Sequence, residues 1–175
     1  MKALKKSLKI TINIILILII LFLLYANIVY YIFGQITLAI VKGNSMYPLL
    51  RDGDLVIVIP SKSIDLGDII IYRNDREEFV IHRVIAILHC GNNPLYITKG
   101  DNNYFIDSLS IVYRKSIECP NAVKTVINAT NSEYRDYIIQ LLYNVERGIN
   151  NDRIEGKALS IGKTIIKITG LWIHS

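Results

Sequence analysis

The feature that most constrains this chain is an uncharged apolar stretch close to its N-terminus. No charged residue occurs between Ile10 and Phe33, and residues 14–24 are all aliphatic or phenylalanine. As a helix, these 24 residues would extend roughly 36 Å, more than the hydrocarbon thickness of a bilayer, about 30 Å. The sequence therefore predicts a transmembrane helix over residues 10–33.

The basic segment before this stretch decides the orientation that we expect. Four lysines precede the apolar run: Lys2, Lys5, Lys6 and Lys9. Positively charged flanks stay in the cytoplasm, and the run is longer than the core of a cleavable signal peptide. We expect an uncleaved single-pass anchor in the cell membrane. Residues 1–9 would be cytoplasmic, residues 10–33 would form the anchor and residues 34–175 would form an extracytoplasmic domain.

The remainder of the chain is nearly neutral, which bears on the class of partner. From Gln35 onward, 16 lysines and arginines face 15 aspartates and glutamates. Because a nucleic-acid-binding domain usually presents a basic face, we expect no nucleic-acid partner.

Two cysteines, Cys90 and Cys119, form no CxxC motif and are not spaced as a metal site. In an oxidising compartment they could form a disulfide. Two separate buried thiols are the alternative, and the sequence leaves both open.

Short β-branched runs follow the apolar stretch, separated by glycine, asparagine, aspartate and proline. Runs at this density predict an antiparallel β-domain. The predicted strands cover residues 36–41, 55–59, 68–73, 79–88 and 95–98. We therefore expect a mainly β fold after the transmembrane helix.

One segment departs from strand periodicity and predicts an inserted amphipathic helix. Apolar residues recur at intervals of three and one from Tyr134 to Val145, which places them on one helix face. Thr130 and Glu133 could form a capping box, and Gly148 would end the helix. We expect the helix to pack on the sheet; a lid or a partner-docking helix is the alternative.

Three short segments carry residue types suited to acyl transfer: residues 43–48 (GNSMYP), 81–84 (IHRV) and 98–103 (TKGDNN). A serine hydroxyl needs a base to take its proton as it attacks a carbonyl, and histidine is suited to this task. Ser45 and His82 could supply the nucleophile and the base. Either Asp101 or Asp107 could orient the base.

In their order and in their residues, these segments resemble the motifs of type I signal peptidases, which remove signal sequences from exported proteins. The matching residues are 43–48, 51–54 (RDGD), 67–69 (GDI), 81–84 and 100–103 (GDNN), with Asp107 after the last. Five motifs in the family's order after a membrane anchor make the resemblance specific. It covers roughly residues 10–107. A histidine at the base position makes the resemblance one to the archaeal and endoplasmic-reticulum branch.

This resemblance implies a membrane-bound serine endopeptidase with a signal-peptidase-like catalytic domain. Carried over residue by residue, it makes Ser45 the nucleophile, His82 the general base and Asp107 the acidic partner. Asp101 would support the site, and Lys99 is a substitute base to which the resemblance gives no role. The implied reaction passes through an acyl-enzyme and needs neither a metal nor an organic cofactor.

The resemblance also implies the partners: preproteins that carry signal peptides, the lipid bilayer and, as an open candidate, the protein translocation machinery. Eleven residues separate Phe33 from Ser45, a reach of about 40 Å, so we expect the nucleophile close to the outer membrane surface. We expect the substrate to pair with a sheet edge, with residues 35–42 as the candidate strand. Small pockets would admit alanine-like residues one and three positions before the cut.

The nucleophile motif departs from the family pattern at Gly43. The family usually has a serine there, and in the bacterial branch its hydroxyl donates to the oxyanion. The backbone N–H of Ser45 could still serve, and the Asn44 side chain could compensate.

The resemblance fades over residues 108–151, which we interpret as an insertion, and partly returns over residues 153–161. The insertion contains the N-glycosylation sequon Asn128-Ala129-Thr130. Two alternatives stay open at this point. One is a membrane-anchored, non-catalytic β-domain that binds a partner, and the other is a related peptidase that processes other surface proteins.

Overall fold

A computed structural model describes residues 2–61, 63–109, 117–119, 121–126, 132–142, 145–162 and 164–169. The chain divides into two units, Met1–Thr37 and Leu38–Ser175. The predicted sequon and the capping role of Thr130 lie outside the described residues.

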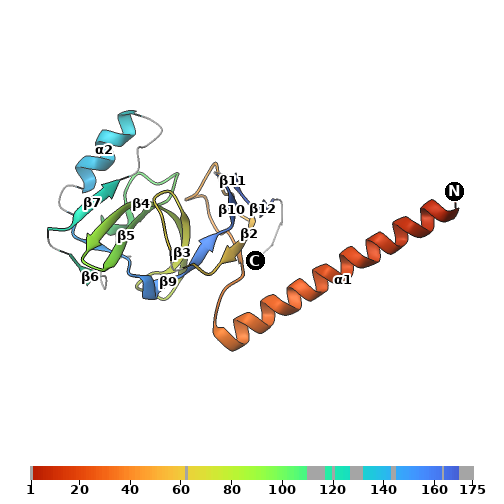
Figure 1. Ribbon diagram of the computed structural model, residues 1–175. Helices are drawn as coiled ribbons and strands as arrows, with labels where there is room; N and C mark the ends of the chain where they lie inside the picture. Colours follow the sequence, from red (N-terminus) through yellow and green to blue (C-terminus); the bar gives the residue numbers. More distant parts are fainter. Residues whose placement is uncertain are drawn as a thin grey trace. The chain divides into compact units, whose positions relative to one another are not determined.

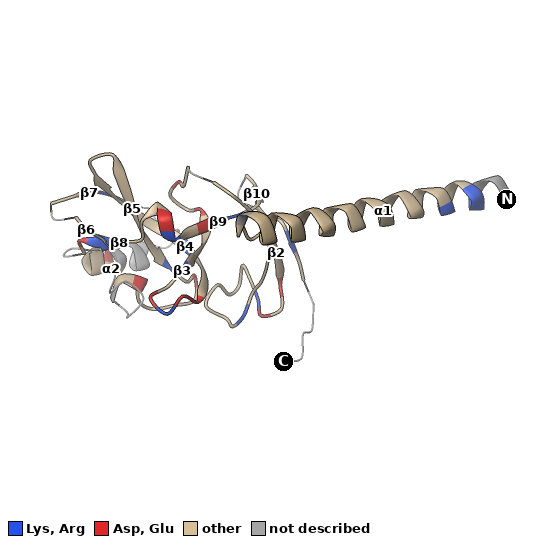
Figure 2. Cartoon of the chain, turned by 90° about the horizontal axis from the view of Figure 1, so that it is seen from below, with Lys and Arg blue, Asp and Glu red and all other residues tan. Residues whose placement is uncertain are grey.

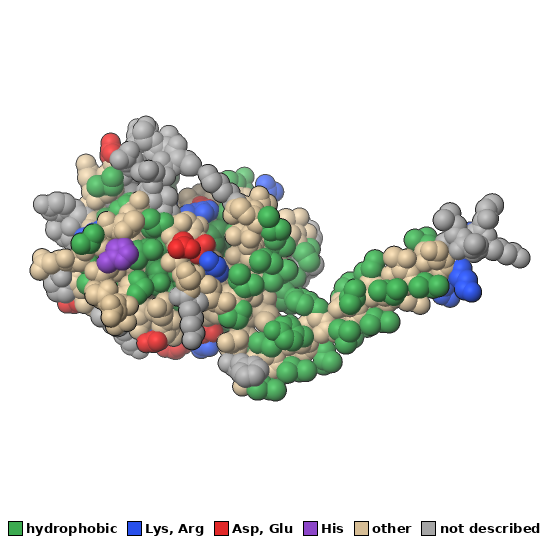
Figure 3. All heavy atoms as spheres, in the orientation of Figure 1, with side chains coloured by type: hydrophobic (Ala, Val, Ile, Leu, Met, Phe, Trp, Pro, Cys, Tyr) green, Lys and Arg blue, Asp and Glu red, His purple; other side chains and the backbone are tan. Residues whose placement is uncertain are grey.

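The described part of the first unit contains one helix, α1 (Lys2–Phe33), about 48 Å long at 1.5 Å per residue (Figure 1). Most of its large apolar side chains are exposed (Figure 3), and lysines lie at its N-terminal end (Figure 2). The part Lys5–Ile32 is long and apolar enough to cross a membrane. The prediction of an N-terminal helix that could span a bilayer is therefore confirmed.

The second unit is built on an eight-stranded antiparallel sheet. Its strands are β1 (Leu38–Ile40), β2 (Leu55–Ile59), β3 (Ile69–Arg73), β4 (Phe79–Cys90), β5 (Asn93–Lys99), β7 (Val123–Val126), β9 (Ile154–Ala158) and β12 (Lys167–Ile168). The main path runs β1-β2-β9-β3-β4-β5, while β12 pairs with β2 and β7 pairs with β4 (Figure 1). The predicted mainly β, antiparallel fold is confirmed.

Shorter elements complete the described part of this unit. They are the strands β6 (Ile117–Glu118), β8 (Arg147–Gly148), β10 (Ser160–Ile161) and β11 (Thr164–Ile165), the 3-10 helices η1 (Asp107–Leu109) and η3 (Asn151–Arg153), and the helix α2 (Ser132–Leu142). The pair β6–β8 and the pair β10–β11 each form a small two-stranded sheet. The predicted inserted helix is therefore present as α2.

The core lies on the central strands because their apolar runs are buried on both sides. In β3, all residues from Ile69 to Tyr72 are at most 2% exposed. The core also receives Leu142 at the end of α2 and Val145 just beyond it. This end of α2 contributes to the core, as expected for a helix that packs on the sheet.

The prediction that the helix continues to Gly148 was wrong. The helix α2 ends at Leu142, and Gly148 pairs with Ile117 in a strand. A Cβ atom at Gly148 would lie 2.8 Å from the Cβ of Leu95. The glycine is needed for close packing against β5, so it is not a helix stop.

The predicted insertion is joined to the sheet at several points. Strand β7 pairs with β4, from Ala86↔Val126 to His89↔Val123. A disulfide links Cys90, at the end of β4, with Cys119, and their Cα atoms are 5.9 Å apart. Of the two alternatives for the cysteines, the structure has the disulfide, the state typical of proteins outside the cytosol.

Candidate active site

The structure brings Ser45, His82 and Asp107 together in one hydrogen-bonded series. His82 Nε2 lies 3.1 Å from Ser45 Oγ, and His82 Nδ1 lies 2.6 Å from Asp107 Oδ2. His82 is 8% exposed and Asp107 is 5% exposed, while Ser45 is half-buried. The series therefore runs from a buried carboxylate outward to a hydroxyl that a substrate can reach.

The chemistry of the carboxylate determines which nitrogen of His82 carries the proton. A carboxylate only accepts hydrogen bonds, so the Nδ1 that faces Asp107 must be the donor. A neutral His82 then has an unprotonated Nε2 directed at the Ser45 hydroxyl, which can donate to it. This order of hydroxyl, imidazole and carboxylate is the one that serine hydrolases use for acyl transfer.

Buried apolar side chains anchor the segment that carries the nucleophile. Ser45 follows β1 in a turn-rich segment, and the next residue, Met46, is 0% exposed. Leu50 is also 0% exposed, and its N–H donates to the Met46 carbonyl at 2.9 Å. The buried side chains on this turn keep the serine at the surface of the sheet.

The loop after β5 holds the nucleophile through its backbone. The N–H of Asn102 donates to the Ser45 carbonyl at 2.8 Å, and its side-chain amide donates to the Asn44 carbonyl at 3.1 Å. A Cβ atom at Gly100 would lie 2.6 Å from the Ser45 carbonyl oxygen. The GDNN segment therefore packs against the serine so closely that only glycine fits at its first position.

Asp101 belongs to a different ion pair. Arg83 Nε and Nη2 donate to its two carboxylate oxygens, each at 2.7 Å, and Arg83 Nη1 donates to the Gly67 carbonyl at 3.0 Å. Because the Asp101 carboxylate accepts from this guanidinium, the pKa of Arg83 is raised. Asp107 contacts His82 and Asp101 supports the adjoining loops, so the structure separates two carboxylates that the residue types alone left as alternatives.

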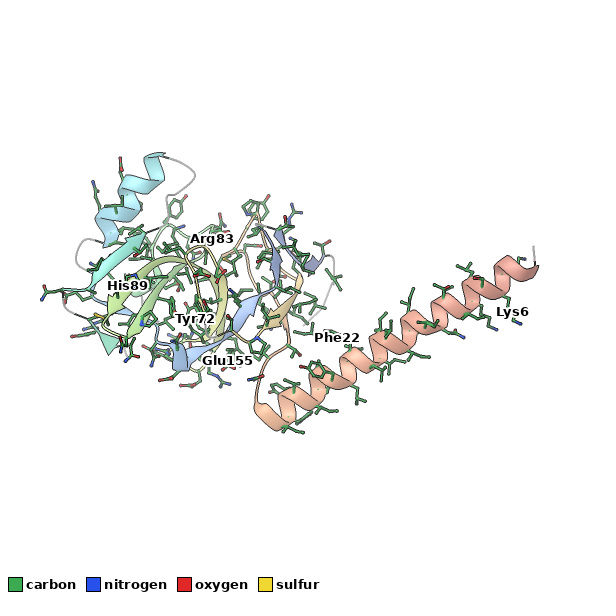
Figure 4. The ribbon with its side chains drawn as sticks, in the orientation of Figure 1. Lys6, Phe22, Tyr72, Arg83, His89 and Glu155 are labelled. Atoms are coloured by element: carbon green, nitrogen blue, oxygen red, sulfur yellow. A yellow bond between two sulfur atoms is a disulfide. The ribbon has the colours of Figure 1, made fainter. Side chains whose placement is uncertain are left out.

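Two buried hydroxyl groups beside Asp107 were missed by the sequence analysis. The Tyr72 hydroxyl donates to Asp107 Oδ2 at 3.0 Å, and the Thr98 hydroxyl donates to the same oxygen at 2.6 Å. Both residues are 0% exposed, and Tyr72 is labelled in Figure 4. In the sequence they lie within apolar strand runs, where tyrosine and threonine are read as core. Only the position of Thr98 next to the GDNN segment was a signal.

Gly43 has a left-handed backbone, with φ at +81°, and its N–H donates to Asp52 Oδ1 at 2.7 Å. A serine at this position would be strained in this conformation. Glycine in place of the family's serine at position 43 therefore suits the left-handed backbone there. The proposed oxyanion donors, the Ser45 N–H and the Asn44 side chain, stay predictions.

Lys99 is buried, at 5% exposure, and its ammonium donates to the Gly100 carbonyl at 3.0 Å. Burial lowers the pKa of this lysine, although Asp101 and Asp107 oppose the shift. Its role as a substitute base stays a prediction. Among the described residues, no three or more histidine, cysteine, aspartate and glutamate side chains cluster as metal ligands.

An antiparallel β-domain with this hydroxyl, imidazole and carboxylate series has the layout of a serine hydrolase site. The family model described as Peptidase S24-like matches residues 25–94, which include Ser45 and His82 and end before Asp107.

Three curated relatives carry names from signal-peptide processing. Signal peptidase I W of Bacillus subtilis is 36% identical over 83 residues, 46% of this chain and 43% of that protein. The signal peptidase complex catalytic subunit SEC11 of Yarrowia lipolytica is 35% identical over 68 residues, 38% of this chain and 40% of the other. SEC11 of Candida tropicalis is 32% identical over 80 residues, with coverages of 45% and 48%.

The chain spans less than half the length of these relatives. The resemblance to type I signal peptidases that the motifs predict is confirmed by these similarities. Together with the apolar helix α1, they fit a membrane protein.

Proposed function

We propose that this protein is a membrane-anchored serine endopeptidase that removes N-terminal signal peptides from exported preproteins. The observation that carries the proposal is the series in which His82 lies 3.1 Å from the Ser45 hydroxyl and 2.6 Å from Asp107. Similarity to signal peptidase I and to SEC11 supports the choice of substrate.

In the proposed reaction, His82 takes the proton of the Ser45 hydroxyl as its oxygen attacks the scissile carbonyl. Asp107 keeps the imidazole oriented and stabilises its protonated form. His82 then gives the proton to the leaving amine, and an acyl-enzyme remains on Ser45. A water molecule, deprotonated by the same histidine, hydrolyses this ester and frees the serine.

The developing oxyanion needs donors that are in place before the attack. We assign this role to the backbone N–H of Ser45, with the side chain of Asn44 as the second donor. One such donor is worth roughly 3 kcal/mol of transition-state stabilisation. Because Gly43 supplies no hydroxyl, a slower acylation than in serine-containing relatives is expected.

For the substrate we propose an extended strand beside β1, which lies at the end of the main sheet path. Strand addition at a sheet edge provides backbone hydrogen bonds, and pockets for alternate side chains provide specificity. We expect these pockets to select alanine-like residues one and three positions before the cut.

The proposed topology places residues 1–9 in the cytoplasm, residues 10–33 across the cell membrane and residues 34–175 outside. The lysines before the apolar run support this orientation. The Cys90–Cys119 disulfide also supports it, since disulfides persist mainly outside the cytosol. The lipid bilayer is the partner of α1, and the translocation machinery is proposed as the source of the substrate.

The decisive experiment measures cleavage of a signal-sequence-bearing preprotein by the full chain in lipid vesicles, beside Ser45→Ala and His82→Ala. We expect one specific cut from the wild type and none from either variant. A preprotein with bulky residues one and three positions before the cut should resist cleavage.

Cutting that survives His82→Ala but not Ser45→Ala would contradict His82 as base and make Lys99 the first substitute to test. A folded wild type that leaves the preprotein intact, while a known signal peptidase cuts it, would overturn the proposal. The non-catalytic β-domain would then be favoured. Cleavage of other surface proteins alone would identify the related peptidase.

A further inference from the structure

The carboxylate of Asp107 is carried by a less regular segment than the histidine that it contacts. His82 lies within the long strand β4, whereas Asp107 begins the 3-10 helix η1. The two residues Tyr104 and Phe105 in the preceding loop are 72% and 61% exposed. The backbone around Asp107 therefore has little regular pairing of its own to define the direction of its side chain.

The strands on both sides of β4 supply side chains that contact the Asp107 carboxylate. Tyr72 of β3 pairs with Val80, and Thr98 of β5 pairs with Val84. His82 lies midway between these two positions, so all three side chains are on the same face of the sheet. The hydroxyl groups thus reach Asp107 from the two neighbours of the strand that carries the histidine.

The protons of this cluster can be counted. Each hydroxyl has one proton to donate. The Thr98 oxygen lies 2.6 Å from Asp107 Oδ2 and 3.3 Å from the Tyr72 oxygen, so its proton goes to the carboxylate. Tyr72 donates to the same Oδ2, which also faces His82 Nδ1. One buried oxygen therefore accepts three hydrogen bonds, an arrangement that fixes the direction of the carboxylate.

We propose that Tyr72 and Thr98 are positioning residues that hold Asp107 in a single orientation and thereby keep the proton of neutral His82 on Nδ1. Without them, the loop-borne carboxylate could rotate away from the imidazole. His82 would then populate the Nε2–H tautomer, which cannot accept the Ser45 proton. The effect on rate rests on the proposed peptidase function, but the effect on the tautomer does not.

Substitutions that remove one oxygen atom test the proposal. Tyr72→Phe and Thr98→Val should each lower kcat for preprotein cleavage about tenfold, the scale of one hydrogen bond to a charged group, with KM unchanged. Thr98→Ser, which keeps the hydroxyl but loses a methyl group, should restore most of the rate lost in Thr98→Val. Tyr96→Phe removes the same atom from another buried tyrosine, 2% exposed, and should cut like the wild type.

A second comparison separates positioning from general stability. In the Asp107→Asn background, adding Tyr72→Phe or Thr98→Val should cause no further loss of kcat, since both act through the Asp107 carboxylate. The same tenfold loss in both backgrounds would overturn the proposal, as would a Thr98→Ser variant no faster than Thr98→Val.

The tautomer itself can be read from ¹⁵N-labelled histidine in the full chain in detergent micelles, with the imidazole ring in its neutral form. The His82 signals are assigned by their loss in His82→Ala. We expect a protonated Nδ1 in the wild type and a mixture of tautomers in the Tyr72→Phe/Thr98→Val double variant. An unchanged Nδ1–H tautomer in the double variant would overturn the proposal even where the wild type cuts. A shifted tautomer in a chain that does not cut would sustain it and count against the peptidase function alone.

Discussion

The two sides of the candidate site are held by different means. On the base side, His82 and Asp107 are buried and are connected through side chains, including the hydroxyls of Tyr72 and Thr98. On the nucleophile side, Ser45 lies in a turn whose backbone packs against the GDNN loop. Proton transfer needs polar groups in fixed orientations. Side chains from neighbouring strands make the hydrogen bonds that orient them. The attacking serine must stay accessible, so it is held from behind by main-chain contacts.

This difference predicts how each side responds to substitution. Removing one polar atom on the base side should change proton transfer and leave the fold nearly intact. On the nucleophile side, adding volume behind the serine should reduce cutting the most.

The largest effect is expected at Asp107. Asp107→Asn should lower kcat by about 10³–10⁴, since the amide no longer keeps His82 in the correct tautomer. Asp101→Asn weakens the ion pair with Arg83, makes no change at His82 and should lower kcat about tenfold. Single-turnover cleavage by both variants is the measurement. Equal losses would contradict the division of roles between the two carboxylates.

The next largest effect is on stability, beneath the nucleophile turn. Asp54 is 1% exposed, and Lys167 donates to it at 2.7 Å and to the Leu49 carbonyl at 2.6 Å. Burial alone would raise the pKa of Asp54, but the hydrogen bonds from Lys167 and from the Arg51 amide lower it overall. Lys167→Met should lower the unfolding free energy at pH 7 by about 3 kcal/mol, because it leaves a buried charge unpaired.

The sign of the pH dependence follows from the lowered pKa. The stabilisation is present above the ordinary value of 3.8 and is lost as the pH falls through the folded-state pKa. The difference between wild type and Lys167→Met should therefore shrink at pH 3, as followed by circular dichroism during unfolding. Lys157→Met removes the partner of the more exposed Asp68, 21% exposed, and should cost less. A larger cost at Lys157 would contradict the ranking of the two pairs.

Gly100→Ala tests the close approach behind the serine. Its Cβ would meet the Ser45 carbonyl oxygen at 2.6 Å, and a displacement of the nucleophile by about 1 Å can cost about 10² in rate. Gly156→Ala is a matched control, because its Cβ would meet the Ile59 carbonyl oxygen at the same 2.6 Å in another part of the sheet. Both should unfold at lower temperature, but only Gly100→Ala should lose activity per folded molecule. Equal activity losses would show that strain in the sheet alone reduces cutting.

The smallest effect is expected from Asn102→Ala. The side chain loses its hydrogen bond to the Asn44 carbonyl, while the backbone bond to the Ser45 carbonyl stays. One exposed hydrogen bond corresponds to a loss in kcat of about fivefold. Asn93→Ala, at another exposed asparagine, should have no effect on cleavage. A loss at Asn102 as large as that of Gly100→Ala would mean that this side-chain hydrogen bond matters as much as the close backbone packing behind Ser45.

Much of the fold was predictable because local signals agreed with the tertiary structure. Strand β2 has the predicted bounds, since a β-branched run follows the turn at Asp52, Gly53 and Asp54. The end of α2 was not predictable in the same way. Gly148 has the local signature of a helix stop, but close packing on Leu95 places it in a strand. Tertiary contacts at this position outweighed local propensity.

In the candidate site, too, some residues were predictable from the sequence and others were not. Ser45 and His82 were singled out from residue types, and the family resemblance added Asp107; in the structure His82 lies within hydrogen-bonding distance of both of the others. Tyr72 was not singled out, and Thr98 was named only as the first residue of the segment 98–103, because a hydroxyl in an apolar strand has no periodicity that distinguishes a polar contact from simple burial. Their role depends on which strands flank β4.

By itself, the sequence determined the apolar helix, the mainly β domain and the residue types for acyl transfer, because these depend on local periodicity and composition. Residue types and local patterns left three outcomes to the tertiary structure: which carboxylate faces His82, which glycine packs behind Ser45 and whether Cys90 meets Cys119. Those outcomes depend on the register of β3, β4 and β5 and on how loops far apart in sequence come together. A one-residue change of register would turn every side chain of a strand to the other face, and no local pattern in the chain records that choice.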